Sequence, residues 1–212
     1  EFYNRGTHQF LGAEPGVENS FRAAIDADPE FALAHIGYAR EMQLRGRSTD
    51  MRQALNRAIK YAKNLSEREQ SHLNVSSLLL SGKSAEARLA VYEHVRHWPR
   101  DVLIAQMCTS VFGLIGFSGL PGREAEQLAF ISNLTNHYGE NWWFKAQLAF
   151  AQLEVGQLHE AATNIEEAIL LNPDSAHSKH IKAHLYYENL EDDDGLTYLK
   201  THWENYDPSG AL

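Results

Sequence analysis

The sequence predicts an all-α fold, a right-handed superhelical solenoid of antiparallel helix hairpins. Apolar residues recur at helical spacing along most of the chain, without the alternation that strands show. Breakers interrupt these segments at a steady interval: Pro29, Pro99, Pro173 and Pro208 lie 70, 74 and 35 residues apart. This spacing fits two, two and one helix–turn–helix units of about 34 to 37 residues. We therefore expect one helical-repeat domain over residues 1–212, with an irregular helical bundle as the alternative.

The clearest hairpin covers residues 142–174. Its first helix ends at Gly156, because glycine adopts the left-handed conformation that a helix end needs. Its second helix ends at Pro173, which cannot donate a backbone hydrogen bond and disfavours helix in the residue before it. The apolar stripe of the second helix consists of small and branched residues: Ala161, Ala162, Ile165, Ala168, Ile169 and Leu170. We expect the alanines to let the two helices approach and the aliphatic side chains to fill the space between them.

Glycine and proline divide the rest of the chain into further predicted helices. They cover residues 1–11, 17–27, 31–44, 50–65, 66–81, 84–97, 102–114, 124–137, 176–190 and 196–205. Ser66, followed three residues later by Glu69, predicts a capping box. The stretch from Gly113 to Gly122 is irregular and apolar. We expect its large residues, Leu114, Ile115, Phe117 and Leu120, to cover the core, with an exposed contact patch as the alternative.

Composition excludes several classes of protein. The formal net charge of −9 argues against a nucleic-acid partner, because a phosphate backbone attracts a basic surface. The sequence has no 18-residue apolar run, so we expect no membrane span. One cysteine, Cys108, cannot form an internal disulfide, which favours a reducing, cytoplasmic location.

The hairpin pattern resembles tetratricopeptide repeats. In residues 142–174 the positions that match the repeat are Leu148, Ala149, Ala161, Ala168 and Pro173. Lys145, Gln152 and Ile165 depart from it, where the repeat has tryptophan, tyrosine and phenylalanine. Ala183, Tyr186 and Pro208 match in the following unit. The resemblance implies stacked hairpins whose first helices line a concave groove.

A narrower resemblance covers most of the chain. The segments that carry it are Asp28 to His35, Ser66 to Glu69 with His72, Pro99 to Asp101, Asn172 to His177, and Ala183-His184. They are similar to bacterial tetratricopeptide-repeat-38-like proteins, a group without an agreed biochemical role. Members of that group continue into a further helical half. The resemblance therefore implies that this chain is a piece of a longer solenoid.

The predicted function is non-enzymatic binding of a protein or peptide, because the groove of a helical solenoid is its usual interaction surface. The residues expected to face the groove combine amide, lysine and aromatic groups, which suit an acidic or C-terminal peptide. They are His35, Tyr38, Met42, His72, Gln106, Lys145, Gln152, Lys179, Lys182 and Tyr186. An uncovered end repeat also predicts a homodimer.

A histidine stripe offers a second hypothesis. His177, His180, His184 and Glu188 lie on one side of a predicted helix, where they could bind a metal if His137, His159 or His202 supplied a further ligand. Packing between repeats is the simpler interpretation, and we expect no cofactor.

The rival class is an enzyme or small-molecule-binding protein with a histidine-rich site formed by His35, His72 and His184. The chain lacks a nucleophile elbow, and Cys108 lies in a predicted apolar helix, where it would be unreactive.

Overall fold

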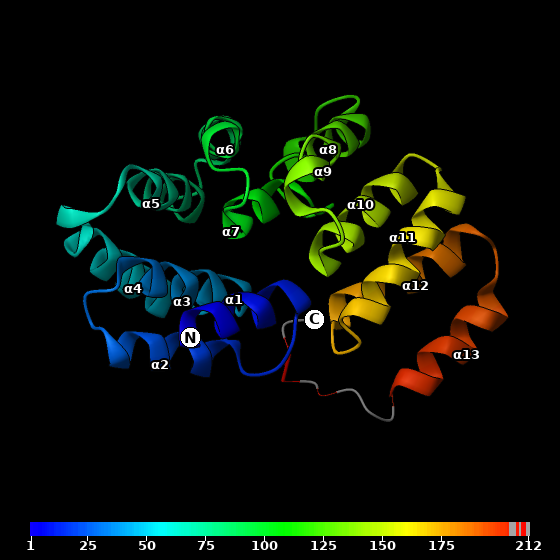
Figure 1. The fold of residues 1–212 in the computed structure, drawn as a ribbon, viewed down its shortest axis with the longest axis horizontal. Helices are drawn as coiled ribbons and strands as arrows, with labels where there is room; N and C mark the ends of the chain where they lie inside the picture. Colours follow the sequence, from blue (N-terminus) through cyan, green and yellow to red (C-terminus); the bar gives the residue numbers. More distant parts are fainter. Residues whose placement is uncertain (204–206, 208, 211–212) are drawn as a thin grey trace. The chain divides into compact units, whose positions relative to one another are not determined.

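The computed structural model describes residues 1–203, 207, 209 and 210, and every regular element in that range is a helix (Figure 1). Within the described part of the chain, most consecutive helices join through short turns and pack against each other, such as α3 with α4, α5 with α6, and α10 with α11. These observations confirm the predicted fold class, an all-α array of antiparallel helix hairpins. No helix of the described part is long and apolar enough to cross a membrane.

The chain forms two compact units. The first comprises Glu1–Phe10 and Glu14–Met107, and the second comprises Leu11–Ala13 and Cys108–Gly210. The expectation of a single domain over residues 1–212 stays a prediction.

The first unit is a series of helices joined by short turns. They are α1 (Phe2–Gly12), α2 (Val17–Ala27), α3 (Ala32–Leu44), α4 (Ser48–Lys60), the 3-10 turn η1 (Ala62–Asn64), α5 (Glu67–Leu80), α6 (Ser84–His97) and α7 (Val102–Ala105). α3 packs against α2 and α4, and α5 packs against α3, α4 and α6. The capping box at the start of α5 is confirmed. The backbone N–H of Glu69 donates to the Ser66 hydroxyl, and the Ser66 N–H donates to the Glu69 carboxylate at 2.9 Å.

Phe21 is the anchor of the first three helices. Its ring is fully buried on α2 and faces Gly6 of α1 and Gly37 of α3. A Cβ atom at position 37 would lie only 2.4 Å from the ring. The close packing around Phe21 therefore depends on glycine at position 37, which has no side chain to collide with the ring.

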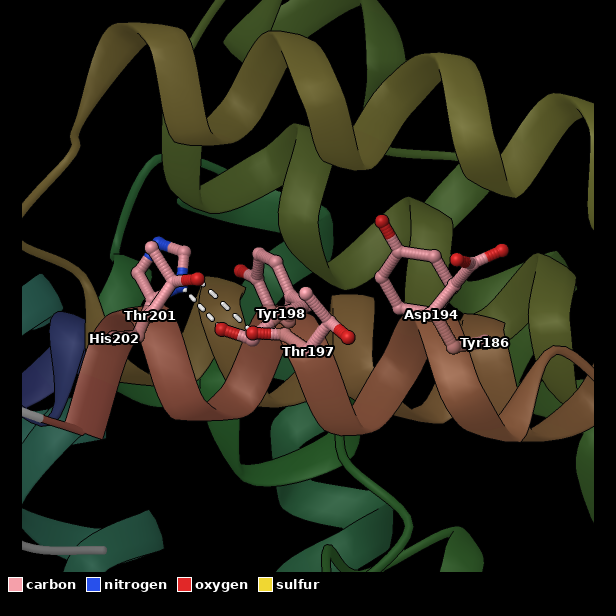
Figure 2. Close-up of a pocket in the computed structure, with 6 residues that line it drawn as sticks. All are labelled: Tyr186, Asp194, Thr197, Tyr198, Thr201 and His202. Atoms are coloured by element: carbon pink, nitrogen blue, oxygen red, sulfur yellow. Dashed lines mark hydrogen bonds between the residues drawn. The ribbon is translucent and has the colours of Figure 1, made fainter.

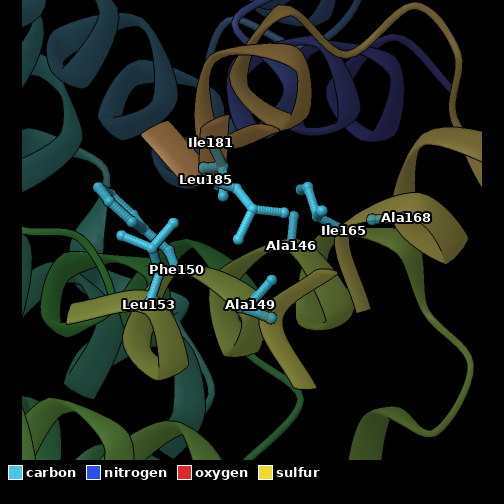
Figure 3. Packing of buried hydrophobic residues seen from close by; sticks show 9 residues of the cluster. Ala146, Ala149, Phe150, Leu153, Ile165, Ala168, Ile181 and Leu185 are labelled. Carbon is cyan, nitrogen blue, oxygen red and sulfur yellow. The ribbon is translucent and has the colours of Figure 1, made fainter. Parts of the chain in front are cut away.

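The second unit holds the hairpin that the sequence predicted best. Its helices are α8 (Arg123–Ser132), α9 (Thr135–Tyr138), α10 (Trp142–Glu154), α11 (Leu158–Leu171), α12 (Ala176–Glu188) and α13 (Asp192–Trp203), and the 3-10 turn η3 (Gly116–Ser118) precedes them. α10 packs against α8, α11 and α12, and α12 packs against α11 and α13. Figure 3 shows the core of this unit, in which side chains of α10, α11 and α12 meet.

The predicted stripe of α11 is largely confirmed. Ala161, Ile165 and Ala168 are buried in the core cluster, and Ala162 and Ile169 pack against it. Leu170 is an exception, because its side chain is 81% exposed.

The predicted helix over residues 102–114 is wrong beyond Cys108. α7 ends at Ala105, and only the short 3-10 turn η2 (Gln106–Cys108) follows it. The chain then doubles back, so that a Cβ atom at Gly116 would lie 2.0 Å from the Val111 carbonyl oxygen. The side chain of Gln127 donates a buried hydrogen bond of 2.9 Å to the Thr109 carbonyl, where a helix would have used a backbone N–H.

The glycine-rich stretch that follows, residues 113–122, partly covers the core and is partly exposed, so each of the two expectations holds for some of its residues. Leu114 and Ile115 are buried, as predicted for core cover. Phe117 and Leu120 are 71% and 46% exposed, so for them the core prediction is wrong. The exposed ring of Phe112 lies 5.5 Å from the ring of Phe117.

Two further boundaries differ from the prediction. The helix expected over residues 124–137 is broken between α8 and α9, where the Thr135 hydroxyl donates to the Ser132 carbonyl at 2.7 Å and competes with helical bonding. The last helix begins at Asp192, four residues earlier than expected, since its first turn holds the acidic residues. The closing Pro208 and the predicted end at residue 205 lie outside the described residues.

Candidate functional site

The predicted groove residues of the first unit lie mostly in its interior. Met42, His35 and His72 are 0%, 2% and 0% exposed, so their side chains serve packing. Nε2 of His35 lies 2.9 Å from the Pro29 carbonyl oxygen. Tyr38 is half-buried, and its hydroxyl accepts a hydrogen bond of 3.0 Å from Arg22. Gln106, also half-buried, lies in η2.

His72 belongs to a buried polar cluster that the sequence did not reveal. Its Nδ1 lies 3.0 and 3.1 Å from the carboxylate oxygens of Asp101, and Nε2 of His94 lies 3.2 Å from the same carboxylate. Arg68 donates to Asp101 at 2.7 Å. Burial alone would raise the pKa of Asp101, but the hydrogen bond from His72 and the nearby His94 ring outweigh it and hold that pKa well below its ordinary range. Asp101 therefore ties the start of α7 to α5 and α6.

The lysines of the second unit point toward α11, where acidic residues meet them. Lys145 of α10 lies 2.5 Å from Glu167 of α11 and 2.8 Å from Glu140. These two carboxylates raise the pKa of the Lys145 ammonium through hydrogen bonds. Lys182 of α12 lies 2.5 Å from Glu166 of α11. The two lysines thus carry local counter-charges.

Gln152 and Lys179 complete the predicted groove set on these helices. The Gln152 side chain accepts a hydrogen bond of 2.9 Å from Asn164 of α11. Lys179 is half-buried on α12.

A pocket of about 340 Å³ opens between α12 and α13 (Figure 2). Tyr186 is the one residue of the predicted groove set that lines it. The other lining residues come from α13: Asp194, Thr197, Tyr198, Thr201 and His202. The rings of Tyr186 and Tyr198 are 5.5 Å apart, and those of Tyr198 and His202 are 4.3 Å apart. Lys182 places its ammonium 4.9 Å from the centre of the Tyr198 ring. The pocket is therefore walled by aromatic rings with polar tips.

Several polar atoms of this pocket are fixed by α13 itself. The Thr197 hydroxyl donates to the Asp193 carbonyl at 2.9 Å, and the Thr201 hydroxyl donates to the Thr197 carbonyl at 3.0 Å. Nδ1 of His202 lies 2.9 Å from the Tyr198 carbonyl oxygen, to which it can donate a hydrogen bond. When the neutral ring donates from Nδ1, its other nitrogen, Nε2, is an acceptor.

The Tyr198 hydroxyl is buried and has no hydrogen-bond partner among the residues that the structure describes. Burial raises the pKa of this phenol, and the charge of Glu166 adds to the effect. The hydroxyl therefore stays a neutral donor at physiological pH.

The sequence does contain a signal for this pocket. Its five α13 residues are spaced i, i+3, i+4, i+7 and i+8 from Asp194, which is one face of a helix. The stripe mixes threonine, tyrosine and histidine, so an apolar-periodicity search does not detect it. Only the packing of α13 on α12 adds Tyr186 to it.

The histidine stripe is only partly assembled. His180 and His184 lie together, with their Nε2 atoms 2.9 Å apart. His177 packs edge-on against Phe150 instead, and burial, with the charge of His180, lowers its pKa to about 4. No group of three or more metal-ligating side chains in the described part of the chain is placed to hold a metal. His137, His159, His202 and Glu188 thus do not complete a site in this conformation.

Comparisons with solved structures found proteins of low sequence identity. No family model matches the chain. It is similar to YrrB, described as a tetratricopeptide-repeat protein with an unusual peptide-binding site, at 14% identity over 85% of this chain and 89% of that one, with a TM-score of 0.49. It is also similar to MamA MSR-1 C2, at 15% identity over 89% and 96% of the two chains, with a TM-score of 0.48. The stacked hairpins of this chain establish its fold class by themselves.

Proposed function

We propose that this chain is a non-enzymatic helical-repeat protein that binds a peptide segment of another protein at the pocket between α12 and α13. The carrying observation is Tyr198: its side chain lines an open pocket, and its buried hydroxyl is a donor without a partner among the described residues. A buried donor gains most from an incoming acceptor, because leaving it unpaired costs free energy. A peptide carbonyl or side-chain oxygen supplies such an acceptor.

The size of the pocket favours a peptide side chain as the group that enters it. Its volume of about 340 Å³ is near the lower end of ligand pockets, which run from about 300 to 1,000 Å³. Tyrosine walls offer apolar area at low conformational cost, and their polar edges orient the bound group. One or two side chains fit, while the rest of the peptide would lie on the surrounding helices.

The ion pairs of the lysines change the expected charge of the peptide. Glu167 and Glu140 neutralise Lys145, and Glu166 neutralises Lys182. Asp194 is exposed at the pocket and adds a negative charge. We therefore propose a peptide of low net charge that brings an oxygen acceptor, in place of the acidic peptide predicted from the sequence.

Peptide selection followed by affinity measurement tests this proposal. Peptides from a random displayed library are selected on the wild-type chain, and fluorescence anisotropy gives their dissociation constants. Tyr198→Phe removes only the hydroxyl, and we expect it to weaken binding about 5- to 10-fold, the worth of one hydrogen bond. Tyr186→Ala should weaken binding further.

Leu199→Ala is the matched control, because Leu199 lies on α13, is 50% exposed and does not line the pocket. It should leave the affinity unchanged. Equal affinity of the selected peptides for wild type and both tyrosine variants would refute the pocket assignment, and failure to select any peptide would refute the function. We also propose a cytoplasmic location and homodimerisation through the end hairpins.

A further inference from the structure

Two histidines on α12 face each other across one helical turn. His180 and His184 are four residues apart, their ring centres are 4.7 Å apart, and their Nε2 atoms are 2.9 Å apart. Residues with this spacing are neighbours on a helix surface. At this distance the Nε2–H of one ring hydrogen-bonds to Nε2 of the other, and a metal ion that displaces this proton would find two imidazole lone pairs side by side.

The separation of the two nitrogens matches the bite of a chelated metal. Metal–imidazole bonds are about 2.0–2.1 Å long. Two such bonds at about 90° place their nitrogens about 2.9 Å apart, whereas a tetrahedral angle places them about 3.3 Å apart. The 2.9 Å separation of the hydrogen-bonded pair therefore also fits adjacent corners of a square or an octahedron. Those geometries are preferred by Cu²⁺ and Ni²⁺.

The surroundings hold one ring in place and leave the other accessible. The His184 ring packs 5.8 Å from the Phe150 ring of α10, and His184 is half-buried. His180 is exposed, so water or another molecule can reach a metal between the two rings. Glu154 of α10 interacts electrostatically with both His184 and Glu188, which adds negative charge near the pair. An ion here would take two ligands from the protein and the rest from solvent.

We propose that His180 and His184 form a two-histidine chelate for a divalent transition metal, with Cu²⁺ and Ni²⁺ bound more tightly than Zn²⁺. The site lies on α12 and uses none of the residues that line the pocket between α12 and α13. It is independent of peptide binding.

Isothermal titration of the tag-free full chain with NiCl₂ at pH 7.5 tests the chelate. We expect saturable one-to-one binding to the wild type, and at least 10-fold weaker binding to His180→Ala and to His184→Ala. His137→Ala is the control, because His137 is an exposed histidine on α9, and it should bind as the wild type does. Circular dichroism confirms that each variant keeps its helix content.

Cu²⁺ provides a readout that is specific for the ligands. Electron paramagnetic resonance of the wild type should show coupling to two imidazole nitrogens, and His180→Ala should lose one of them. Absence of saturable Ni²⁺ binding up to about millimolar metal would overturn the proposal, as would unchanged binding by the His180→Ala/His184→Ala double variant. Tighter binding of Zn²⁺ than of Ni²⁺ would overturn the assigned geometry.

Discussion

Replacing Asp101 should destabilise the first unit, because its carboxylate is the shared acceptor of a buried cluster. Asp101→Ala removes the acceptor for His72 and the close charge partner of His94, both of which have side chains that are 0% exposed. A hydrogen bond to a charged group contributes about 1.5–3 kcal/mol. Taking the upper value for the bond from His72, and nothing for His94 or for the 40% exposed Arg68, gives a loss of about 3 kcal/mol. For a chain of this length that corresponds to a melting temperature about 6–12 °C lower.

The conservative variant separates the charge from the shape. Asp101→Asn keeps one oxygen acceptor, so we expect about half of that loss. Thermal unfolding followed by circular dichroism at pH 7 measures both variants. Asp174→Asn is the control, since Asp174 is exposed in the turn after α11, and its effect should stay within about 0.5 kcal/mol. Melting temperatures of Asp101→Ala and wild type within 2 °C of each other, with the control equally unchanged, would refute the reasoning.

The pH dependence gives an independent check on the same cluster. The folded-state pKa of Asp101 lies below its ordinary value of 3.8, so the stability it contributes is present above that value and is lost as the pH falls below it. The difference in melting temperature between wild type and Asp101→Asn should therefore be constant from pH 7 to about pH 5 and shrink below about pH 4. A difference that grows on acidification would show that another group controls the effect.

Two further predictions concern local packing and helix capping. Gly37→Ala should destabilise the chain by about 1–3 kcal/mol, because the new Cβ atom would lie 2.4 Å from the rigid Phe21 ring. A chemical denaturation midpoint equal to that of the wild type would contradict this close packing. Ser66→Ala should cost about 1 kcal/mol through loss of the cap on α5, measured in the same denaturation series, and Ser84→Ala, at the first residue of α6 where no side-chain cap bond is present, should cost less.

Local chemistry determined much of this protein directly from its sequence. The helix ends at Gly156 and Pro173, the capping box at Ser66 and the buried face of Ala161, Ile165 and Ala168 depend on residues close together in the chain. Spacing along a helix fixes which side chains share a face, so the interval of breakers and the apolar stripes were enough to predict the fold class.

Only the tertiary structure decided which faces meet and what they leave open. In the sequence, Lys145 and Lys182 looked like free groove cations. In the structure, α11 lies between α10 and α12 in the chain and pairs Glu167 with Lys145 of α10 and Glu166 with Lys182 of α12. Asp101 finds His72 twenty-nine positions away in the chain, and Tyr198 joins Tyr186 only because α13 folds back on α12. Such contacts depend on the rotation of each helix about its axis, which propensity and periodicity leave undetermined for polar residues. The candidate binding surfaces therefore depend on how the helices pack, whereas the hairpins that carry them could be predicted from the sequence.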